Sequence, residues 1–223
     1  MKLSNSTIEV LKNFSSINPN ILIEPGETLK TISEAKNIMA VAEINDTFST
    51  EVGIYDLNEF LSAYGLVDDP DIVFGQTDLD IMCGNARVRY AYSSKDILTY
   101  PQKDINQPDY ELSLNLSQDQ LDQIKRAASV LGHSDLEING EDGVVTSKVF
   151  DEKDSTANTF ELAIDPSNAC KNKFSFVFHI PNLKLLPGDY FVTISKQLIS
   201  NWQNTSFPVN YFIALEKASE FHV

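Results

Sequence analysis

Long hydrophobic runs and cysteines are both scarce in this sequence of 223 residues. No stretch of 18 or more apolar residues occurs, so no segment is long enough to cross a membrane as a helix. The two cysteines, Cys83 and Cys170, lie far apart in the sequence. The opening stretch MKLSNSTIEV contains no apolar signal region. We therefore expect a cytosolic protein whose two thiols are reduced.

The residue patterns of common catalytic and metal sites are also missing. No two of the three histidines, His133, His179 and His222, have the spacing that would place them on one helix face. The sequence has no glycine-rich phosphate loop, C-x-x-C pair or G-x-S-x-G elbow. The acidic stretches 68–71 and 140–143 lack calcium-loop spacing and are typical of turns. We predict no enzyme, no metal and no cofactor, while a Ser, His and Asp triad assembled from distant positions stays an open alternative.

Positively charged residues are also scarce. The chain has 17 Lys plus Arg against 32 Asp plus Glu, a formal net charge of −15. This balance opposes free binding to nucleic acid, because phosphates must be neutralised by cations. Nevertheless, Lys125 and Arg126 stand side by side in the stretch NLSQDQLDQIKRAASVLG. They either serve a cationic surface or only support their own helix, since Asp122 precedes Arg126 by the favourable four residues.

That stretch predicts a helix over Leu116–Leu131. Ser117 and Gln120 have the spacing of a capping box, and Gly132 supplies a left-handed stop. An apolar stripe follows the helical period and faces a core, which places Arg126 on the opposite side of the helix.

Most of the remaining chain is typical of short strands separated by turns. The expected strands are Ile21–Glu24, Thr28–Ile32, Ile38–Ile44, Thr47–Ile54, Ile72–Phe74, Leu79–Cys83 and Arg87–Tyr92, with one of the turns at Asn45-Asp46. The other expected helices are Ser6–Ile17, Leu57–Tyr64 and a short one near Pro181–Leu186. Ser93–Tyr110, with Pro101 and Pro108, is interpreted as a linker.

The order of elements repeats at an offset of 113 residues. Lys2–Ile17 aligns with Asn115–Val130, and this places Lys12 opposite Lys125. In each half a strand and a glycine turn follow the long helix, and a later strand runs into a second short helix. The sequence thus predicts an α+β fold of two similar domains, 1–92 and 110–223, joined by a linker over 93–109. Each domain would carry antiparallel sheets and two helices.

Five strings, spread from end to end, resemble the DNA polymerase sliding clamps of T4-type bacteriophages. They are MKLS at the start, LKNF (Leu11–Phe14), IYDLNEFL (Ile54–Leu61), LPGDYFV (Leu186–Val192) and NYFIALE (Asn210–Glu216). The resemblance implies a homotrimer that closes six domains into a ring around duplex DNA. Helices would line the hole, and sheets would form the outer wall.

This resemblance gives the cations of the helices an expected role. Lys12, Lys125, Arg126 and Lys184 would face DNA, with Lys2 as a weaker fifth candidate. The hole would then carry cations, and the surplus acids would lie on the outer rim. Because the net charge opposes free binding, attachment would depend on topology rather than on affinity.

The resemblance also implies two protein interfaces. Arg87–Tyr92 would pair with Asn158–Ile164 of the next subunit, and the candidate contacts are Arg87, Tyr90, Tyr92, Phe160 and Leu162. A pocket near the linker would bind the C-terminal tail of the DNA polymerase, and its candidate residues are Ile97, Leu98, Tyr100, Tyr211 and Phe212.

The implied partners are the polymerase, a clamp-loader complex and late transcription factors, in the cytoplasm of an infected bacterium. An acidic, β-rich virion or interaction protein without a DNA function is the main alternative.

Overall fold

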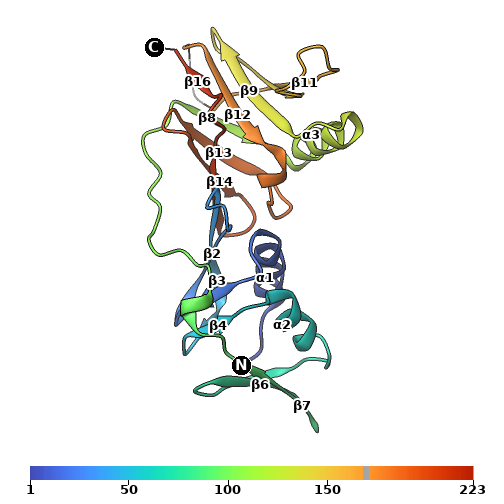
Figure 1. Cartoon of the computed structure of the whole chain (residues 1–223), viewed down its shortest axis with the longest axis vertical. Helices are drawn as coiled ribbons and strands as arrows, with labels where there is room; N and C mark the ends of the chain where they lie inside the picture. The colour runs from blue at the N-terminus through green and yellow to red at the C-terminus, as the bar shows by residue number, and fades with distance from the viewer. Residues whose placement is uncertain (168–170, 223) are drawn as a thin grey trace. The chain divides into compact units, whose positions relative to one another are not determined.

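The computed structural model describes residues 1–167 and 171–222, so Cys170 lies outside the described residues. The chain divides into two compact units, Met1–Asp104 and Ile105–Val223. Both are built mainly from antiparallel sheets, as the sequence predicts (Figure 1). The domain boundaries at 92 and 110 stay a prediction. Residues 93–104 pack on the first unit, where the Ser93 N–H donates to the Gly53 carbonyl at 2.9 Å.

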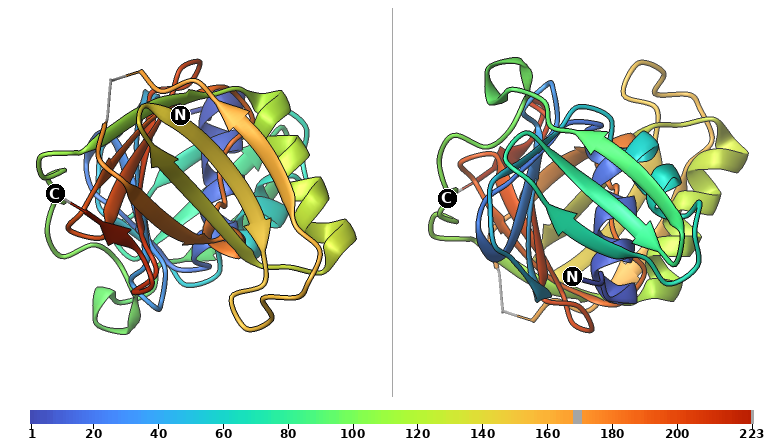
Figure 2. Two further views of the ribbon diagram at one scale, coloured as in Figure 1. Left: turned by 90° about the horizontal axis from the view of Figure 1, so that it is seen from above. Right: turned by 90° about the horizontal axis from the view of Figure 1, so that it is seen from below.

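The first unit contains two helices and three groups of antiparallel strands. Its elements are α1 (Asn5–Ile17), β1 (Ile21–Ile23), β2 (Gly26–Ile32), β3 (Ile38–Phe48), β4 (Val52–Ile54), α2 (Leu57–Tyr64), β5 (Asp71–Phe74), β6 (Asp78–Cys83), β7 (Ala86–Ala91) and the 3₁₀ turn η1 (Lys95–Ile97). Strand β1 pairs with β4, β2 pairs with β3, and β5, β6 and β7 form a three-stranded sheet with β7 at an edge. Figure 2 (right) shows β6 and β7 running side by side.

Helix α1 is fixed at both ends by polar groups. The Ser4 side chain accepts the Thr7 N–H at the start, and the Asn18 N–H donates to the Phe14 carbonyl at the end. The side-chain amide of Asn18 also donates to the carbonyls of Ile32 and Thr99 at 2.7 and 3.0 Å. The core face of α1 is fully buried, so the helix is held in one orientation against α2 and β3.

The second unit contains one α-helix and two antiparallel sheets. Its elements are β8 (Leu112–Leu116), α3 (Gln118–Leu131), β9 (Asp135–Glu141), β10 (Val144–Phe150), β11 (Phe160–Ile164), β12 (Phe174–His179), the 3₁₀ turn η2 (Ile180–Asn182), β13 (Tyr190–Ser195), β14 (Ile199–Asn204), β15 (Val209–Ala214) and β16 (Glu220–Phe221). One sheet has the order β11-β10-β9-β12-β16, and in the other β13 lies between β8 and β14, with β15 following β14. Helix α3 lies beside the β10–β11 end of the five-stranded sheet (Figure 2, left).

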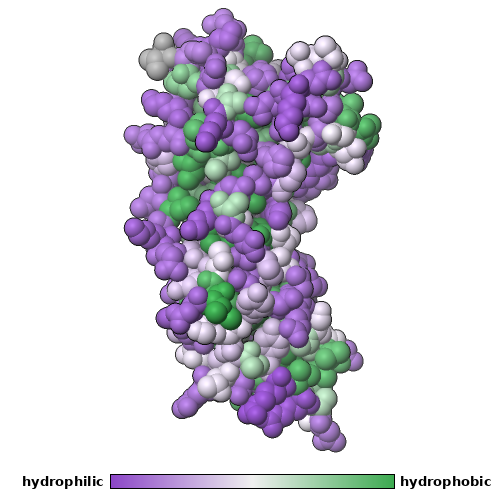
Figure 3. Space-filling model, viewed as in Figure 1, coloured by the Kyte–Doolittle hydropathy of each residue, from purple (hydrophilic) through white to green (hydrophobic). Residues whose placement is uncertain are grey.

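Aromatic side chains fill the core of the second unit. Trp202 is completely buried between Phe178 and Tyr190, with ring centroids 5.7 and 6.3 Å away. Tyr190 in turn lies 6.2 Å from Tyr211, which is also completely buried. Burying rings of this size contributes several kcal/mol of hydrophobic stabilisation. On the face seen in Figure 3, hydrophilic residues predominate, and hydrophobic ones form small separate areas.

Two predicted elements are wrong. The turn expected at Asn45-Asp46 does not form, because β3 continues to Phe48 and the chain turns at residues 49–51 instead. Asp46 has a tertiary role: its carboxylate accepts the backbone N–H and the hydroxyl of Ser4 at 2.9 and 2.7 Å. The helix expected near Pro181–Leu186 is only the 3₁₀ turn Ile180–Asn182, so the second unit has one α-helix rather than two.

Candidate DNA-facing helices and subunit edges

Helices α1 and α3 carry three of the cations that the sequence assigns to a DNA-facing surface. Lys12 is exposed on α1, and on α3 Arg126 is exposed while Lys125 is half-buried. The capping box of Ser117 and Gln120 forms as predicted, and Gly132 ends α3 with a φ of +72°. The helix therefore begins and ends at fixed positions, and this determines which side chains point outward.

Neither Arg126 nor Lys125 forms an ion pair within the described part of the chain. The local explanation for Arg126, a pair with Asp122, is therefore not what the structure contains. Asp122 instead accepts a hydrogen bond from the Gln118 side chain at 2.8 Å. By contrast, Lys30 on β2 pairs with Asp104 at 2.6 Å.

Partial burial changes the chemistry of Lys125. It lowers the pKa of the ammonium group, and the nearby Asp122 carboxylate opposes this effect. Lys125 is therefore the less exposed of the two cations, and Arg126 is the more exposed one.

The helices are close to neutral rather than strongly basic. Across α1, α2 and α3 there are three cations, Lys12, Lys125 and Arg126, against the four acids Glu9, Glu59, Asp119 and Asp122. Most of the net charge of −15 is therefore carried elsewhere in the chain. The helices that would line the hole are thus nearly balanced in charge, and the cationic lining itself stays a prediction.

Two of the expected DNA-facing cations lie in other surroundings. Lys2 forms an ion pair with Asp69, and this hydrogen bond raises the pKa of the Lys2 ammonium. Lys184 is not on a helix but follows η2, and it is half-buried. Lys2 therefore shares its charge with the Asp69 carboxylate, and its DNA-facing role stays a prediction.

Strand β7 presents an open edge of the three-stranded sheet. Arg87 pairs with Asp80 at 2.6 Å on one face. On the other face Tyr90 packs edge-to-face on Phe60 of α2, 5.4 Å between ring centroids, and its hydroxyl donates to the Asp56 carbonyl at 3.2 Å. Burial raises the pKa of Tyr90 to about 12. Tyr92, just beyond the strand, is half-buried, and its N–H donates to the Thr77 carbonyl at 2.9 Å.

Strand β11 presents the corresponding open edge in the second unit, where β10 is its only strand partner among the described residues. Phe160 and Leu162 are half-buried on one face of this strand. Phe160 borders a mostly apolar groove of about 330 Å³ between β11 and α3, which we call the α3–β11 groove. Val130 contributes to this groove and is 78% exposed.

The candidate pocket residues are dispersed. Ile97 is 61% exposed, whereas Leu98 is buried beside Gly53 and Tyr100 is half-buried. Tyr211 must be corrected, because its completely buried hydroxyl accepts the Leu186 N–H inside the core of the second unit.

Phe212, the next residue along β15, lies on the opposite face of the sheet. It is directly opposite Asn201, which in turn is opposite Thr193. On this face there is a groove of about 720 Å³, which we call the sheet groove, and it is lined by Gln107, Pro108, Asp109, Tyr110, Phe191, Thr193, Asn201 and Gln203.

Two side chains of the sheet groove are polar and unsatisfied. Both amide atoms of Gln107 and the carbonyl oxygen of Asn201 are buried without a hydrogen-bond partner among the described residues. Buried polar groups normally have partners. Sequence reasoning missed the sheet groove, and the only available signal was the polar and apolar alternation of β13 and β14.

Residues 1–167 and 171–222 contain neither a metal-site cluster nor a membrane-spanning helix. No group of three or more His, Cys, Asp or Glu in this part of the chain is placed to hold a metal ion. None of its helices combines the length and the apolar character needed to cross a bilayer.

Comparison with solved structures shows the fold. The chain superposes with a TM-score of 0.71 and 12% identity on PCNA from A. fulgidus, solved with the C-terminal region of FEN-1, over 98% of both chains. It superposes equally well, with a TM-score of 0.71 and 12% identity, on the pol III beta chain of Caulobacter crescentus. That match covers 97% of this chain and spans 64% of the longer Caulobacter chain.

Comparison of sequences shows the family. Residues 2–97 match the family described as DNA polymerase processivity factor, and residues 113–217 match the gp45 sliding clamp C-terminal family. The sliding clamp of Vibrio phage KVP40 is 32% identical over 97% of this chain and 99% of its own length. That of Escherichia phage RB69 is 30% identical over 98% of both. The chain therefore belongs to the sliding clamps of T4-type bacteriophages, the non-enzymatic processivity factors of DNA polymerase.

Proposed function

We propose that three copies of this chain close head to tail into a ring that encircles duplex DNA. The observation that carries this proposal is the pair of open strand edges, β7 in the first unit and β11 in the second. An unpaired edge strand invites pairing with another chain. Head-to-tail contacts between different surfaces form a ring when the rotation between copies closes.

The charge distribution supports sliding rather than tight binding. The helices offer three cations against four acids, and the whole chain carries −15. Few phosphates would be neutralised, so free affinity for DNA is low. A closed ring would nevertheless stay on DNA because it is topologically linked, and weak inner contacts would let it move.

We further propose that the sheet groove binds the C-terminal tail of the replicative polymerase. The groove combines the apolar surfaces of Tyr110 and Phe191 with the unsatisfied polar atoms of Gln107 and Asn201. A bound peptide could supply hydrogen bonds to these atoms and bury an apolar side chain against the rings. Phe212, beside Asn201, would lie at the margin of the groove.

The remaining partners are proposed from the family alone. A clamp-loader complex would open the ring on DNA in the cytoplasm of the infected bacterium. Late transcription of the phage is a second process that the loaded ring would serve. No feature of the described residues favours the alternative of a virion protein without a DNA function.

The test combines mass and processivity. Light scattering at micromolar concentration should give about three times the chain mass of 24.9 kDa. On a primed circular template, the ring and its loader should lengthen the products of the phage polymerase at limiting enzyme. A monodisperse monomer together with unchanged product lengths would refute the proposal.

A further inference from the structure

We propose that the ring is kept head to tail by charges on its edge strands. In this arrangement Arg87 and Arg89 on β7 of one copy face Glu161 on β11 of the next copy. The inference rests on the proposed ring and specifies which groups select its geometry.

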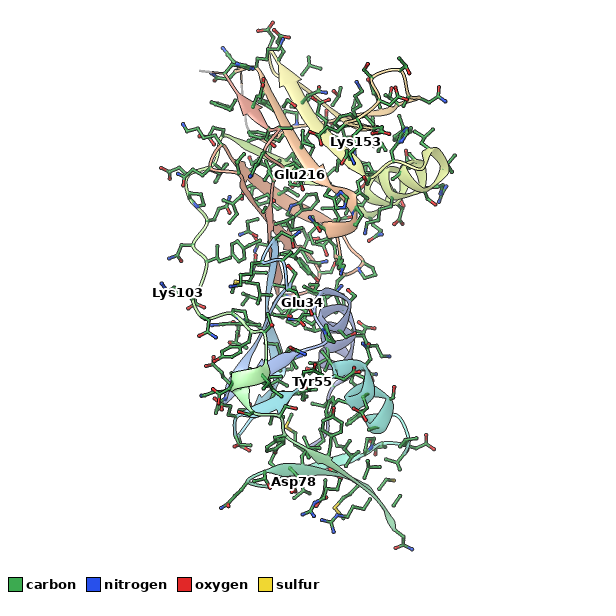
Figure 4. All side chains as sticks on the ribbon, in the orientation of Figure 1. Glu34, Tyr55, Asp78, Lys103, Lys153 and Glu216 are labelled. Atoms are coloured by element: carbon green, nitrogen blue, oxygen red, sulfur yellow. The ribbon has the colours of Figure 1, made fainter. Side chains whose placement is uncertain are left out.

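Strand β7 carries its two arginines on one face. Alternate residues of a strand point to the same side, so Arg87 and Arg89 both lie opposite Tyr90. On the neighbouring strand Asp80 pairs with Arg87 at 2.6 Å, and Asp78 pairs with Arg89 at 3.3 Å. Figure 4 labels Asp78 on β6.

The exposure of these groups shows which charge reaches the edge. The side chains of Arg87 and Arg89 are 56% and 66% exposed, against 17% and 22% for Asp80 and Asp78. The carboxylates thus hold the guanidinium groups from behind. A guanidinium has five N–H donors, so most of them stay available to another chain. The accessible edge is therefore cationic.

Strand β11 has the opposite sign at its edge. Glu161 is exposed and forms no ion pair within the described residues. Lys148 lies directly across from it on β10, but the Lys148 ammonium lies 6.0 Å from the centroid of the Phe150 ring. Asp165, also exposed, directly follows the strand. Within the described residues, the β11 edge therefore offers the unpaired carboxylate of Glu161.

The other face of each edge strand is apolar and lies toward a helix. On β7, Val88 accompanies Tyr90, which packs on α2. On β11, Leu162 accompanies Phe160, which borders the α3–β11 groove. If β7 and β11 pair with their helix sides aligned, apolar side chains meet on one face and opposite charges meet on the other. Because side chains alternate between the two faces of each strand, the apolar and charged faces match in both a parallel and an antiparallel pairing.

The same charges disfavour the wrong pairings. Two β7 edges would bring arginines together, and two β11 edges would bring carboxylates together, so only the β7–β11 junction is attractive. The competing explanation is that each edge is charged only to prevent aggregation. In that case the two edges would act independently of each other, and this difference can be measured.

The experiment is a double-mutant cycle on assembly. Glu161→Lys places a cation against the arginines, and Arg87→Gln with Arg89→Gln removes them. Sedimentation velocity over a concentration series gives the midpoint of trimer formation for the parent, each variant and the combination. Glu34→Lys is the matched control, because Glu34 is an exposed, unpaired acid in the β2–β3 turn of the described chain (Figure 4).

We expect Glu161→Lys to raise the midpoint concentration by about tenfold at low salt, and less at high salt where charges are screened. The control should behave like the parent. In the Arg87→Gln/Arg89→Gln background the same lysine should have no effect or should favour assembly, since Asp78 and Asp80 then remain at the edge. Thermal unfolding of each variant checks that it is folded.

A parent-like midpoint for Glu161→Lys, or an equal shift in both backgrounds, would overturn the charge match while leaving the ring intact. A parent that never assembles would instead refute the proposed ring itself.

Discussion

Replacing Lys125 and Arg126 together with glutamine should leave the stability of the fold almost unchanged. Arg126 is exposed and makes no ion pair within the described residues, so its loss should change the free energy of unfolding by less than about 0.5 kcal/mol. Partial burial holds the pKa of Lys125 below its ordinary value of 10.5. Its charge therefore opposes folding at neutral pH, and this opposition disappears as the pH rises toward 10.5. An uncharged glutamine in place of Lys125 should therefore leave the free energy of unfolding unchanged or raise it slightly.

The effect on DNA should be large by comparison. In a ring of three copies the change removes two cations from each subunit. Each phosphate contact that is lost reduces the slope of log affinity against log salt by about 0.9. The loss of all six cations would therefore reduce this slope by at most about 5. The residence time of loaded rings on nicked circular DNA, measured over a series of salt concentrations, should fall and depend less on salt.

The control variant changes cations that lie outside the helices. Lys103 and Lys217 are exposed and unpaired within the described residues, and replacing both with glutamine removes the same charge. This control should keep the parent's residence time. If the Lys125 and Arg126 variant slides and dissociates like the parent at every salt concentration, the DNA-facing role of the pair is refuted.

Asp46→Ala should lower the free energy of unfolding by about 1–2 kcal/mol in urea titrations at pH 7, because two groups of Ser4 lose their acceptor. Burial alone would raise the pKa of Asp46, but hydrogen bonds from Thr7 and Ser4 outweigh it and lower the pKa. The stability difference between the parent and Asp46→Ala should therefore vanish as the pH falls well below about 3.9 and the carboxylate is protonated. Trp202→Ala should cost about 3–5 kcal/mol in the same assay. Phe212→Ser should weaken polymerase-tail binding, measured by fluorescence anisotropy, whereas Tyr211→Phe should cost about 1–2 kcal/mol of stability without affecting the tail.

The helices were predictable because their signals are local. Ser4 and Ser117 begin α1 and α3 at the predicted offset of 113 residues. Leu57–Tyr64 agrees with the prediction at both ends, and at its start Asp56 accepts the backbone N–H groups of Asn58 and Glu59. A cap and an amphipathic stripe involve residues within one or two turns of each other, so the sequence contains all of the information.

The errors arise where distant residues decide the outcome. Asn45-Asp46 has turn chemistry, but the Asp46 carboxylate is used by Ser4, 42 residues away. The segment after Pro181 stays non-helical, and the Leu186 N–H donates to Tyr211 rather than to a helical carbonyl. Burial of Tyr211 depends in the same way on Tyr190 and Trp202. Local propensity cannot report such contacts.

The candidate surfaces were partly predictable. The cations of α3 could be placed on an outward face from helical periodicity, but the absence of an Asp122–Arg126 pair in the described chain depends on the Gln118 side chain. The edge strands β7 and β11 were identified as interface candidates from the family resemblance. The charge alternation in ARVRYA and FELAI is visible in the sequence, yet its meaning requires the sheet order that leaves both strands at edges.

The most direct test of the account compares one DNA molecule in two topologies. Rings loaded by the phage clamp loader on nicked circular DNA are separated from free protein by gel filtration, before and after a single restriction cut. The account predicts retention on the circle and loss after linearisation, because helices that are nearly balanced in charge would hold DNA only if the proposed ring encircles it. Equal retention on circular and linear DNA would show that affinity holds the protein and would contradict the account.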